Sequence, residues 1–440
     1  MLKSLLPRHP PKPPPPLTPK IHPHRPLTTT PKESKGRPQK SLPAAYYRGG
    51  TSRAVIFDRA HLPKPNKNKE AWAPIFRAVI GSPDAAHKRQ LDGMGGGISS
   101  LSKVCIVSGT PTHPAADVDY TFVSLGVVDD HVDYTSNCGN MSAAIGPFAV
   151  DSGVFKPALL GVGEEGEVTV RIHNTNTGKI IHSTFPVVRS EMDPGLVEAA
   201  TSGDFEIDGV TGSAARIQLD FLDPAGSVTG TLLPTGREVD VFEVKVEGTR
   251  GEKKMEVEAT CIDVGNPCVF VRAADLGVRG NLTPDELTAD LPLLEKLNRI
   301  RRQAGVEMGI ASTPEAVPGS IPKICMVAAP GEDARSVEKE QTPQRVDLVA
   351  RALSVGQPHK ALPITVALSL AAAARVEGST VAQIVNGKEM IDAAGITIGH
   401  ASGNLLVGAA FAEDGALKSG RVFSTARRLF EGRVFWKDEQ

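Results

Sequence analysis

The sequence contains no apolar run that approaches the roughly 20 residues of a membrane-spanning helix. Its 440 residues are 40% hydrophobic and 22% charged, which is typical of a globular protein in water. Single hydrophobic cores stop growing near roughly 250 to 300 residues, so a chain of this length has room for two domains. We therefore expect two domains and no membrane partner.

Cysteine is scarce, and the number of cysteines is odd: five, at positions 105, 138, 261, 268 and 325. Most of them lie inside apolar runs, which favours a reducing compartment over a disulfide framework. The chain has no Cys-x-x-Cys pair and no histidine cluster, so no metal site is expected. It also lacks the Walker and Rossmann fingerprints, so nothing indicates a nucleotide or flavin, and we expect no cofactor.

Outside its first 40 residues, the chain has no excess of basic over acidic residues. Residues 1–40 carry a net charge of +8, whereas the other 400 residues carry −9. The bulk charge of this body excludes a general nucleic-acid binder. An anionic ligand would need a local pocket.

Residues 1–40 contain twelve prolines and no periodic pattern, so their composition predicts disorder. The segment is basic and contains Ser and Thr, which suits a mitochondrial presequence, and Arg25-Pro26-Leu27 before Thr28 resembles a cleavage site. The prolines would interrupt an import helix, so the alternative is a Pro-rich linker or tail that has no targeting function. The predicted location is mitochondrial, with the cytoplasm as the alternative.

The body contains an internal repeat. "LSKVCIV" at 101–107 matches "IPKICMV" at 321–327, which lies 220 residues later. Each motif predicts a buried strand that begins at a lysine, and each is followed by a polar stretch and then a helix of small residues. The halves open with strand and hairpin signals at 45–57 and 214–236. This pattern favours two copies of one β-rich domain, each around one apolar helix.

Three further segments carry clear patterns. Residues 166–188 and 420–436 alternate apolar and polar side chains, and the first of them contains an Asn-Thr-Gly turn. The segment that starts at Thr283 with Thr-Pro-Asp-Glu predicts a helix. We place the domains at 41–208 and 209–440 and leave open whether the final strand crosses back to the first domain.

Cys138 lies in "SNCGNMSAAIG", directly before the first helix of small residues. A thiol at a helix N-terminus meets free amides and the positive end of the helix dipole, which favour the thiolate. Cys138 is therefore a candidate acid or base. A partly buried turn cysteine without a chemical role is the alternative, because free cysteine often behaves as a small hydrophobe.

Lys103 lies at the N-terminal end of an apolar strand and follows the Gly-rich segment "DGMGGGISSLS". The glycines allow backbone amides to approach an anion closely, and a lysine removed from water is a suitable proton carrier. A solvated surface lysine is the alternative. The copy at Lys323 weakens that alternative.

Three polar loops supply hydrogen-bond donors: residues 48–53, residues 265–267 and residues 400–404. Arg48 and the Gly, Ser and Thr residues of the first loop suit carboxylates. Each loop alone is also an ordinary turn. Together they predict a polar cleft between two domains.

The motifs "RGGTSR", "SLSKVCIV", "SNCGNMSAAIGPFAVDSG", "IDVGNPCVFV", "PKICMV" and "HASGN" occur in an order and spacing that closely resemble the PrpF family. The resemblance runs from about residue 44 to the C-terminus. Members of this family are cofactor-independent isomerases of 2-methylaconitate, methylitaconate, aconitate and 4-oxalomesaconate. More distantly, the chain resembles diaminopimelate epimerase. This implies an α+β fold of two tandem domains, each a β-barrel-like sheet closed around a central helix, with the active site in the interdomain cleft.

The resemblance implies that Lys103 and Cys138 form the catalytic acid/base pair. The residues expected to contact substrate are Arg48, Gly50, Thr51, Ser52, Ser102, Asn137, Gly139, Asn140, Asn266, Lys323, His400, Ser402 and Gly403. Two departures occur: Arg53-Ala54 stands where the family often shows Lys-Gly, and no second thiol begins the second helix, where Thr365 or nothing would act. Cys268 lies in another loop, which disfavours a symmetric two-thiol racemase.

The predicted reaction is a 1,3-proton shift in an unsaturated di- or tricarboxylate of the aconitate or methylaconitate type, which moves the double bond or interconverts cis and trans forms. One member of the pair removes a proton, and backbone amides with Arg48, Ser52 and Lys323 stabilise the resulting charge. The alternatives are a carboxylate-binding protein without turnover and an amino-acid epimerase. The predicted partner is the small carboxylate alone, and a homodimer is left open.

Overall fold

The structure is a computed structural model that describes residues 38–64, 69–157, 165–190, 196–248, 251–331, 346–385, 390–393 and 395–437. The chain divides into two units, Met1–Pro38 and Gln39–Gln440, and the fold described below is that of the second unit. The disordered leader predicted at residues 1–40 therefore lies almost wholly outside the described residues. Within the described ranges, no helix is long and apolar enough to cross a membrane.

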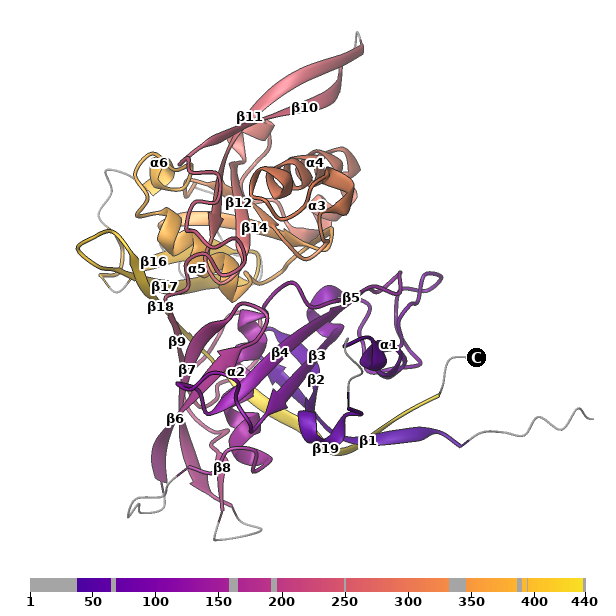
Figure 1. The fold of residues 1–440 in the computed structure, drawn as a ribbon. Helices are drawn as coiled ribbons and strands as arrows, with labels where there is room; N and C mark the ends of the chain where they lie inside the picture. Colours follow the sequence, from indigo (N-terminus) through magenta and orange to yellow (C-terminus); the bar gives the residue numbers. More distant parts are fainter. Residues whose placement is uncertain are drawn as a thin grey trace, which may run out of the picture. The chain divides into compact units, whose positions relative to one another are not determined.

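Strands of the described ranges connect by pairing into one mixed sheet, in which we distinguish two strand sets (Figure 1). The first strand set consists of β1 (Lys40–Gly49), β2 (Ser52–Asp58), β3 (Lys103–Ser108), β4 (Val118–Leu125), β5 (Val132–Asp133), β6 (Glu165–Asn174), β7 (Lys179–Arg189), β8 (Val197–Ala199), β9 (Ile217–Leu222), β18 (Leu417–Ser424) and β19 (Ala426–Trp436). The second strand set consists of β10 (Asp240–Gly248), β11 (Gly251–Asp263), β12 (Pro267–Arg272), β13 (Lys323–Ala328), β14 (Leu348–Ser354), β15 (Gln357–Pro358), β16 (Ile396–His400) and β17 (Gly403–Phe411).

The two sets repeat one order of pairings, as the duplicated motif predicts. β2 runs parallel to β3, β3 antiparallel to β4, and β4 parallel to β6. In the second set, β12 runs parallel to β13, β13 antiparallel to β14, and β14 parallel to β16. Lys103 and Lys323 are the first residues of the corresponding strands β3 and β13.

Two segments of the first set come from the far part of the sequence. β19 pairs with β1 in antiparallel register, with Lys40 opposite Trp436, so the last described strand lies beside the first (Figure 1). β18 pairs with β9 and with β17, and so connects the two sets. The division into domains at 41–208 and 209–440 stays a prediction.

The segment 214–236 does not open the second half as a hairpin, contrary to our expectation. Its strand, β9, pairs with β7 and β18 of the first set, and the hairpin that precedes β13 is formed by β11 and β12. The alternation in "IQLDFL" identifies a strand but carries no information about its partner.

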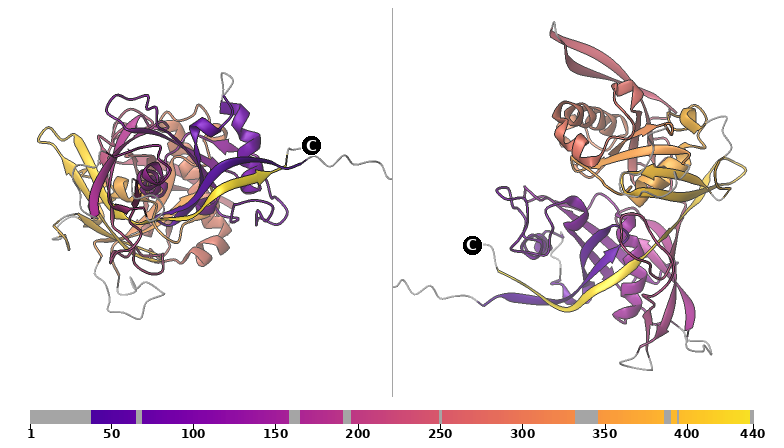
Figure 2. Two further views of the ribbon diagram at one scale, coloured as in Figure 1. Left: turned by 90° about the horizontal axis from the view of Figure 1, so that it is seen from below. Right: turned by 180° about the vertical axis from the view of Figure 1, so that it is seen from behind.

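Each strand set packs against one central helix. The helices are α2 (Gly139–Asp151) and α5 (Ile364–Ala373); all of α5 and all of α2 except Asp151 is buried. α2 contacts β1, β2, β6, β7, β9 and β19 of the first set (Figure 2). A helix that is apolar or small on every side is stable only when covered on every side, which explains the composition of both helices. The mixed sheet with buried helices agrees with the predicted α+β class.

The other helices are α1 (Ala73–Ile80), α3 (Pro284–Ala289), α4 (Leu291–Glu307) and α6 (Ala382–Val385). The helix predicted from Thr283 begins there with a capping box to Glu286 but breaks at Asp290. The Asp290 side chain accepts a hydrogen bond from Leu293 N and thereby starts α4.

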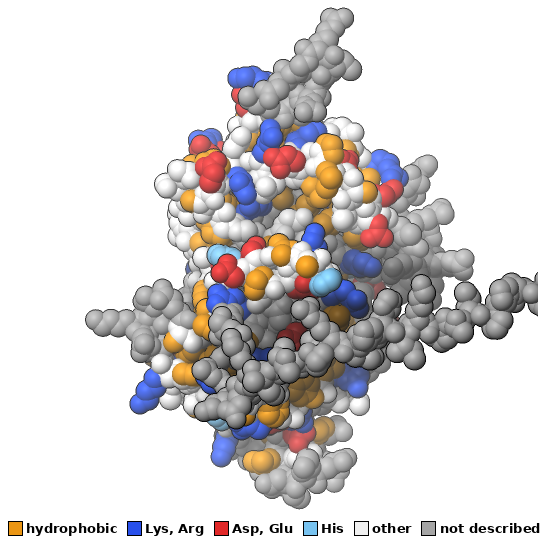
Figure 3. Space-filling model, turned by 90° about the vertical axis from the view of Figure 1, so that its right-hand side faces the viewer, with side chains coloured by type: hydrophobic (Ala, Val, Ile, Leu, Met, Phe, Trp, Pro, Cys, Tyr) orange, Lys and Arg blue, Asp and Glu red, His pale blue; other side chains and the backbone are white. Residues whose placement is uncertain are grey.

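On the face shown in Figure 3, acidic and basic side chains are interspersed.

Candidate active site

Lys103 is a buried lysine, not a solvated surface residue. Its side chain begins β3, is 6% exposed, and places Nζ 5.1 Å from the centroid of the Phe122 ring on β4. At this distance, the ammonium group interacts favourably with the face of the ring. The strand and the ring therefore fix the position of the amine.

Cys138 is the N-cap residue of α2, with extended backbone angles, and it is partly exposed. All five cysteines lie within the described residues, and the other four are buried. Burial raises the pKa of Cys268 to about 11 and raises the pKa values of the remaining three as well. Among the described cysteines, Cys138 is thus the thiol that solvent or substrate reaches, and it lies at the N-terminus of α2.

Lys323 lies close enough to both Lys103 and Cys138 to interact with them electrostatically. Burial lowers its pKa, the thiols of Cys268 and Cys138 oppose that shift, and Lys103 adds to it. Its Nζ donates to the carbonyl oxygen of Ser320 at 3.4 Å. The lysines of the two repeat motifs, Lys103 and Lys323, therefore form one group with the partly exposed thiol of Cys138.

The N-termini of the two central helices meet beside this group. A Cβ added to Gly139, the first residue of α2, would lie 2.9 Å from the Cβ of Ile364, the first residue of α5. The residue that precedes α5, in the place that Cys138 has before α2, is Pro363. The positive ends of both helix dipoles converge here, which favours an anionic ligand.

Asn266 and Asn137 connect the halves at the same point. Asn266 Nδ2 donates to the carbonyl of Asn137 at 2.6 Å and to Thr365 Oγ1 at 3.2 Å, and its Oδ1 accepts from Asn137 N at 2.9 Å. All three residues are buried. Their predicted role in binding substrate stays a prediction; their geometry positions Cys138.

The turn between β1 and β2 packs onto the start of α2. Asn140 Nδ2 donates to Thr51 Oγ1 at 3.0 Å and approaches Ser52 Oγ at 3.5 Å. Gly50 has a φ of +52°, and a Cβ there would lie 2.9 Å from Asn140 Oδ1, so both the backbone and the contact require glycine. Gly50, Thr51, Ser52 and Asn140 are therefore neighbours, and their contact with substrate stays a prediction.

Arg48 is engaged within the protein. Its Nη1 contacts the carbonyl oxygens of Gly50 and Thr425 and the Thr425 hydroxyl, each at 3.0 Å. Burial lowers its pKa, and nearby Arg427 lowers it further. Arg48 thus stabilises the turn that carries Thr51 and Ser52, and its proposed contact with a carboxylate has to come from its remaining N–H groups.

The hydroxyl of Ser102 lies inside the Gly-rich loop. It donates toward Gln90 Oε1 at 2.7 Å and the Ile98 carbonyl at 2.8 Å, and the residue is fully buried. Gln90 Oε1 also accepts from Gly97 N at 2.9 Å. Ser102 and Gln90 therefore order the loop that precedes Lys103; the role of Gln90 was not predicted, because nothing in a lone glutamine marks it.

His400, Ser402 and Gly403 form the turn between β16 and β17. Burial lowers the pKa of His400 to about 4, and His400 Nδ1 accepts from Ser402 N at 3.2 Å. A Cβ at Gly403 would collide with the Asp208 carboxylate, which accepts from Asn404 N at 2.6 Å. A Cβ at Gly209 would touch both Thr51 and Ser402, so this turn and the β1–β2 turn lie on either side of Gly209.

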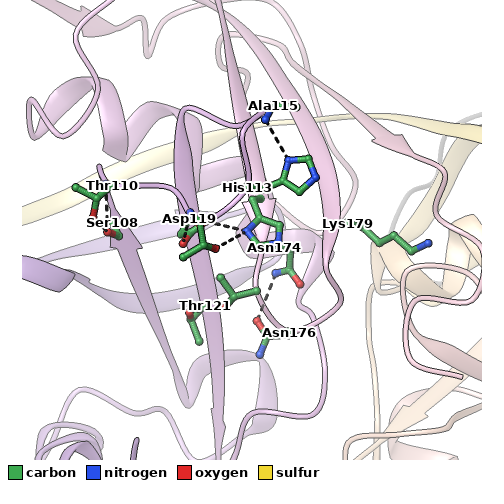
Figure 4. Close-up of polar contacts among 12 residues, drawn as sticks. Ser108, Thr110, His113, Ala115, Asp119, Thr121, Asn174, Asn176 and Lys179 are labelled. Atoms are coloured by element: carbon green, nitrogen blue, oxygen red, sulfur yellow. Dashed lines mark hydrogen bonds and ion pairs between the residues drawn. The ribbon is translucent and has the colours of Figure 1, made fainter. Parts of the chain in front are cut away.

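Two asparagines at the turn after β6, Asn174 and Asn176, are joined by a hydrogen bond of 3.4 Å (Figure 4) and also contact the surroundings of the site. Asn174 Nδ2 donates to Asn137 Oδ1 at 3.2 Å, next to Cys138. Asn176 bonds both backbone groups of Phe122, at 2.8 and 2.9 Å, and Phe122 carries the ring beneath Lys103. The turn after β6 therefore positions the surroundings of both candidate catalytic residues. Its Asn-Thr-Asn-Thr-Gly composition signals the turn but not these long-range contacts.

Comparison with known proteins identifies the family. The PrpF protein family model matches residues 39–437. A 3-methylitaconate isomerase of Eubacterium barkeri is 35% identical over 401 residues, 90% of this chain and 97% of that protein. A 2-methyl-aconitate isomerase of Cupriavidus necator is 37% identical over 409 residues, which are 90% of this chain and 97% of that protein.

A solved structure agrees with these relatives. The crystal structure of a methylitaconate-delta-isomerase superposes with a TM-score of 0.67 at 35% identity, and it covers 90% of this chain and 96% of that one. Both relatives named above are bacterial, which gives no support to the mitochondrial address expected from the leader. The chain belongs to the PrpF family, and it is an isomerase.

Proposed function

We propose that the protein is a cofactor-independent isomerase that moves a double bond in an unsaturated tricarboxylate of the methylaconitate or aconitate type. The observation that carries the proposal is the grouping of Lys103, Lys323 and the partly exposed thiol of Cys138. Two ammonium groups and two helix N-termini favour a ligand with several negative charges. The name of one relative, a 2-methyl-aconitate isomerase, supports a tricarboxylate substrate, and that of the other, a 3-methylitaconate isomerase, supports an unsaturated carboxylate with two carboxyl groups.

In the proposed reaction, Lys103 and Cys138 are the acid/base pair. One of them, in its unprotonated form, removes a proton from the carbon next to the double bond, and the electron pair of the broken C–H bond spreads into the conjugated carboxylate as a dienolate. The other returns a proton to the far carbon, and the double bond moves. Each turnover leaves the pair with the opposite protonation, and exchange with solvent restores it.

Charge stabilisation is the second part of the proposal. The dienolate concentrates negative charge on carboxylate oxygens, which the amides at the start of α2 and the ammonium group of Lys323 stabilise. Arg48, Ser52, His400 and Ser402 would contact the other carboxylates from the surrounding turns. We also propose that these groups line a cleft between two diaminopimelate epimerase-like domains.

Proton exchange tests the proposal directly. The purified protein is incubated in deuterated buffer with cis-aconitate, trans-aconitate, 2-methylaconitate or itaconate, and deuterium incorporation and ultraviolet absorbance are followed. We expect exchange and isomerisation with at least one tricarboxylate, and a fall of at least roughly a hundredfold in Lys103→Met and in Cys138→Ser.

Lys418→Met is the matched control, because Lys418 is an exposed lysine on β18. Full activity in both site variants would defeat the assignment of the pair. Saturable binding without exchange would indicate a carboxylate-binding protein, and inversion of an amino-acid stereocentre would indicate an epimerase.

A further inference from the structure

We propose that His359 is a further substrate-binding residue of this site and that its Nε2–H donates a hydrogen bond to a substrate carboxylate. The proposal rests on the proposed function in one respect, the carboxylate nature of the ligand. His359 belongs to no motif of the sequence, and none of the comparisons assigns it a role.

The backbone connects the segment that carries His359 to the surroundings of both lysines. It directly follows β15, and its N–H donates to the Ala352 carbonyl on β14 at 2.9 Å. Gln357, two residues earlier, accepts from Ser99 N at 3.1 Å through its side-chain oxygen. Ser99 opens the short helix Ser99–Leu101 that leads into Lys103. This segment of the second half therefore reaches the loop that precedes the catalytic lysine of the first half.

The ring of His359 has one buried nitrogen without a partner. Nε2 is inaccessible to solvent and has no hydrogen bond among the described residues. Buried polar atoms of side chains are nearly always hydrogen-bonded in folded proteins, because an unpaired one loses its interaction with water. A bound ligand atom would supply the missing partner.

The charges that face His359 are those of Lys103 and Lys323. Together with burial, they lower the pKa of His359 to about 3, so the imidazole is neutral at physiological pH. A neutral imidazole has one donor and one acceptor nitrogen. An ionised carboxylate only accepts hydrogen bonds, so the ring can serve it only as a donor. His359 would thus add a directed hydrogen bond beside the two lysines without adding a third positive charge.

Three substitutions separate this role from a structural one. In glutamine, the amide nitrogen can reach the position of Nε2; in asparagine, it reaches only that of Nδ1; alanine offers no donor. We expect His359→Gln to bind substrate within about threefold of wild type. We expect His359→Ala and His359→Asn to bind it roughly 10- to 100-fold more weakly, the usual effect of losing a hydrogen bond to a charged group.

The test is calorimetric titration of the full-length protein with propane-1,2,3-tricarboxylate, which has no double bond to move. Binding is thereby measured independently of turnover. If the wild-type protein binds this compound but never exchanges protons with a substrate, the proposed isomerisation is refuted, and the role of His359 in binding can still be tested. His131→Gln is the control, since His131 is exposed. Thermal unfolding is measured for every variant.

Weakened binding in the alanine and asparagine variants, with rescue by glutamine and unchanged thermal midpoints, is the expected result. The inference is overturned if all three variants bind like wild type. It is overturned equally if all three lose the same affinity, if lost binding follows lost stability, or if wild type binds no tricarboxylate.

Discussion

The side chain of Asn266 and the main chain of Asn137 form two reciprocal hydrogen bonds, one of 2.6 Å from Asn266 Nδ2 to the carbonyl and one of 2.9 Å from the amide to Oδ1. A primary amide is matched to this task because it carries a donor and an acceptor side by side. The contact joins residues 129 positions apart, directly before the candidate catalytic Cys138. The backbone that leads into Cys138 is therefore held by a residue of the other half.

Substitution of Asn266 should impair both stability and activity. In Asn266→Ala, two buried backbone groups lose their partners, which should cost about 2–4 kcal/mol of unfolding free energy. Asn266→Asp should cost at least as much, because one carboxylate oxygen would face the Asn137 carbonyl. Chemical denaturation and deuterium exchange into substrate are the measurements. A stable Asn266→Ala with full exchange activity would contradict this positioning role.

A methyl group at Gly139 should disturb the meeting point of the two central helices. The added Cβ of Gly139→Ala would lie 2.9 Å from both Cβ and Cγ2 of Ile364, which has little freedom to move inside α5. Overpacking of this kind costs about 1–3 kcal/mol, which a lower thermal midpoint would report. Gly432→Ala is the control, because a Cβ at Gly432 meets no atom within 4 Å. Equal midpoints for the two variants would argue against close contact between α2 and α5.

Acid should destabilise the protein partly through His400. Its pKa is lowered to about 4 in the folded protein by burial, whereas the unfolded chain has the ordinary value of about 6.5. Between these values the unfolded state binds more protons, so the stability contributed above pH 6.5 is lost as the pH falls toward 4. The loss attributable to this group is at most about 3 kcal/mol.

His400→Asn isolates this contribution, because an asparagine oxygen can accept from Ser402 N as Nδ1 does but does not titrate. Denaturation free energies at pH 7 and pH 5 should differ less in the variant than in wild type. An identical difference in both proteins would show that His400 titrates normally in the fold.

Lys323 should show the same linkage at higher pH. Burial lowers its pKa below the ordinary lysine value, so protonated Lys323 opposes folding. Stability should therefore rise with pH from the lowered pKa up to the unfolded value, and Lys323→Met should abolish that rise. We expect the variant to unfold at a higher temperature at pH 7 and to bind tricarboxylates more weakly. A less stable variant with the wild-type pH dependence would contradict the buried charge.

The parts of the fold that were predictable are those encoded by local patterns that occur twice. The motifs around Lys103 and Lys323 predicted equivalent buried strands, and the runs of small residues predicted the two central helices. Strand partners were harder, because alternation assigns a face but not a neighbour. The hairpin expected from residue 214 onward is therefore absent, and β9 pairs instead with β7 and β18. The helix break at Asp290 depends on one capping side chain.

Candidate residues could be named from the sequence where a residue type has a characteristic chemistry, and not where a common residue acts through distant contacts. Cys138 and Lys103 are of the first kind, and their catalytic role stays a prediction. Asn176 and Gln90 are of the second kind, since each is an ordinary polar residue whose hydrogen bonds join segments that only the fold brings together. His359 shares this property, because only the fold brings it near Lys103 and Lys323.

The pairing of β1 with β19 has a consequence for synthesis on the ribosome. The second strand set is nearly contiguous in sequence, from Asp240 to Phe411, so all its strands are available once residue 411 has emerged. The first strand set begins earlier but receives its edge partner only with Ala426–Trp436. Chains commonly fold from the N-terminus as they emerge. Here the half that is translated first is the half completed last, because it needs residues 426–436, which follow the whole second strand set in the sequence.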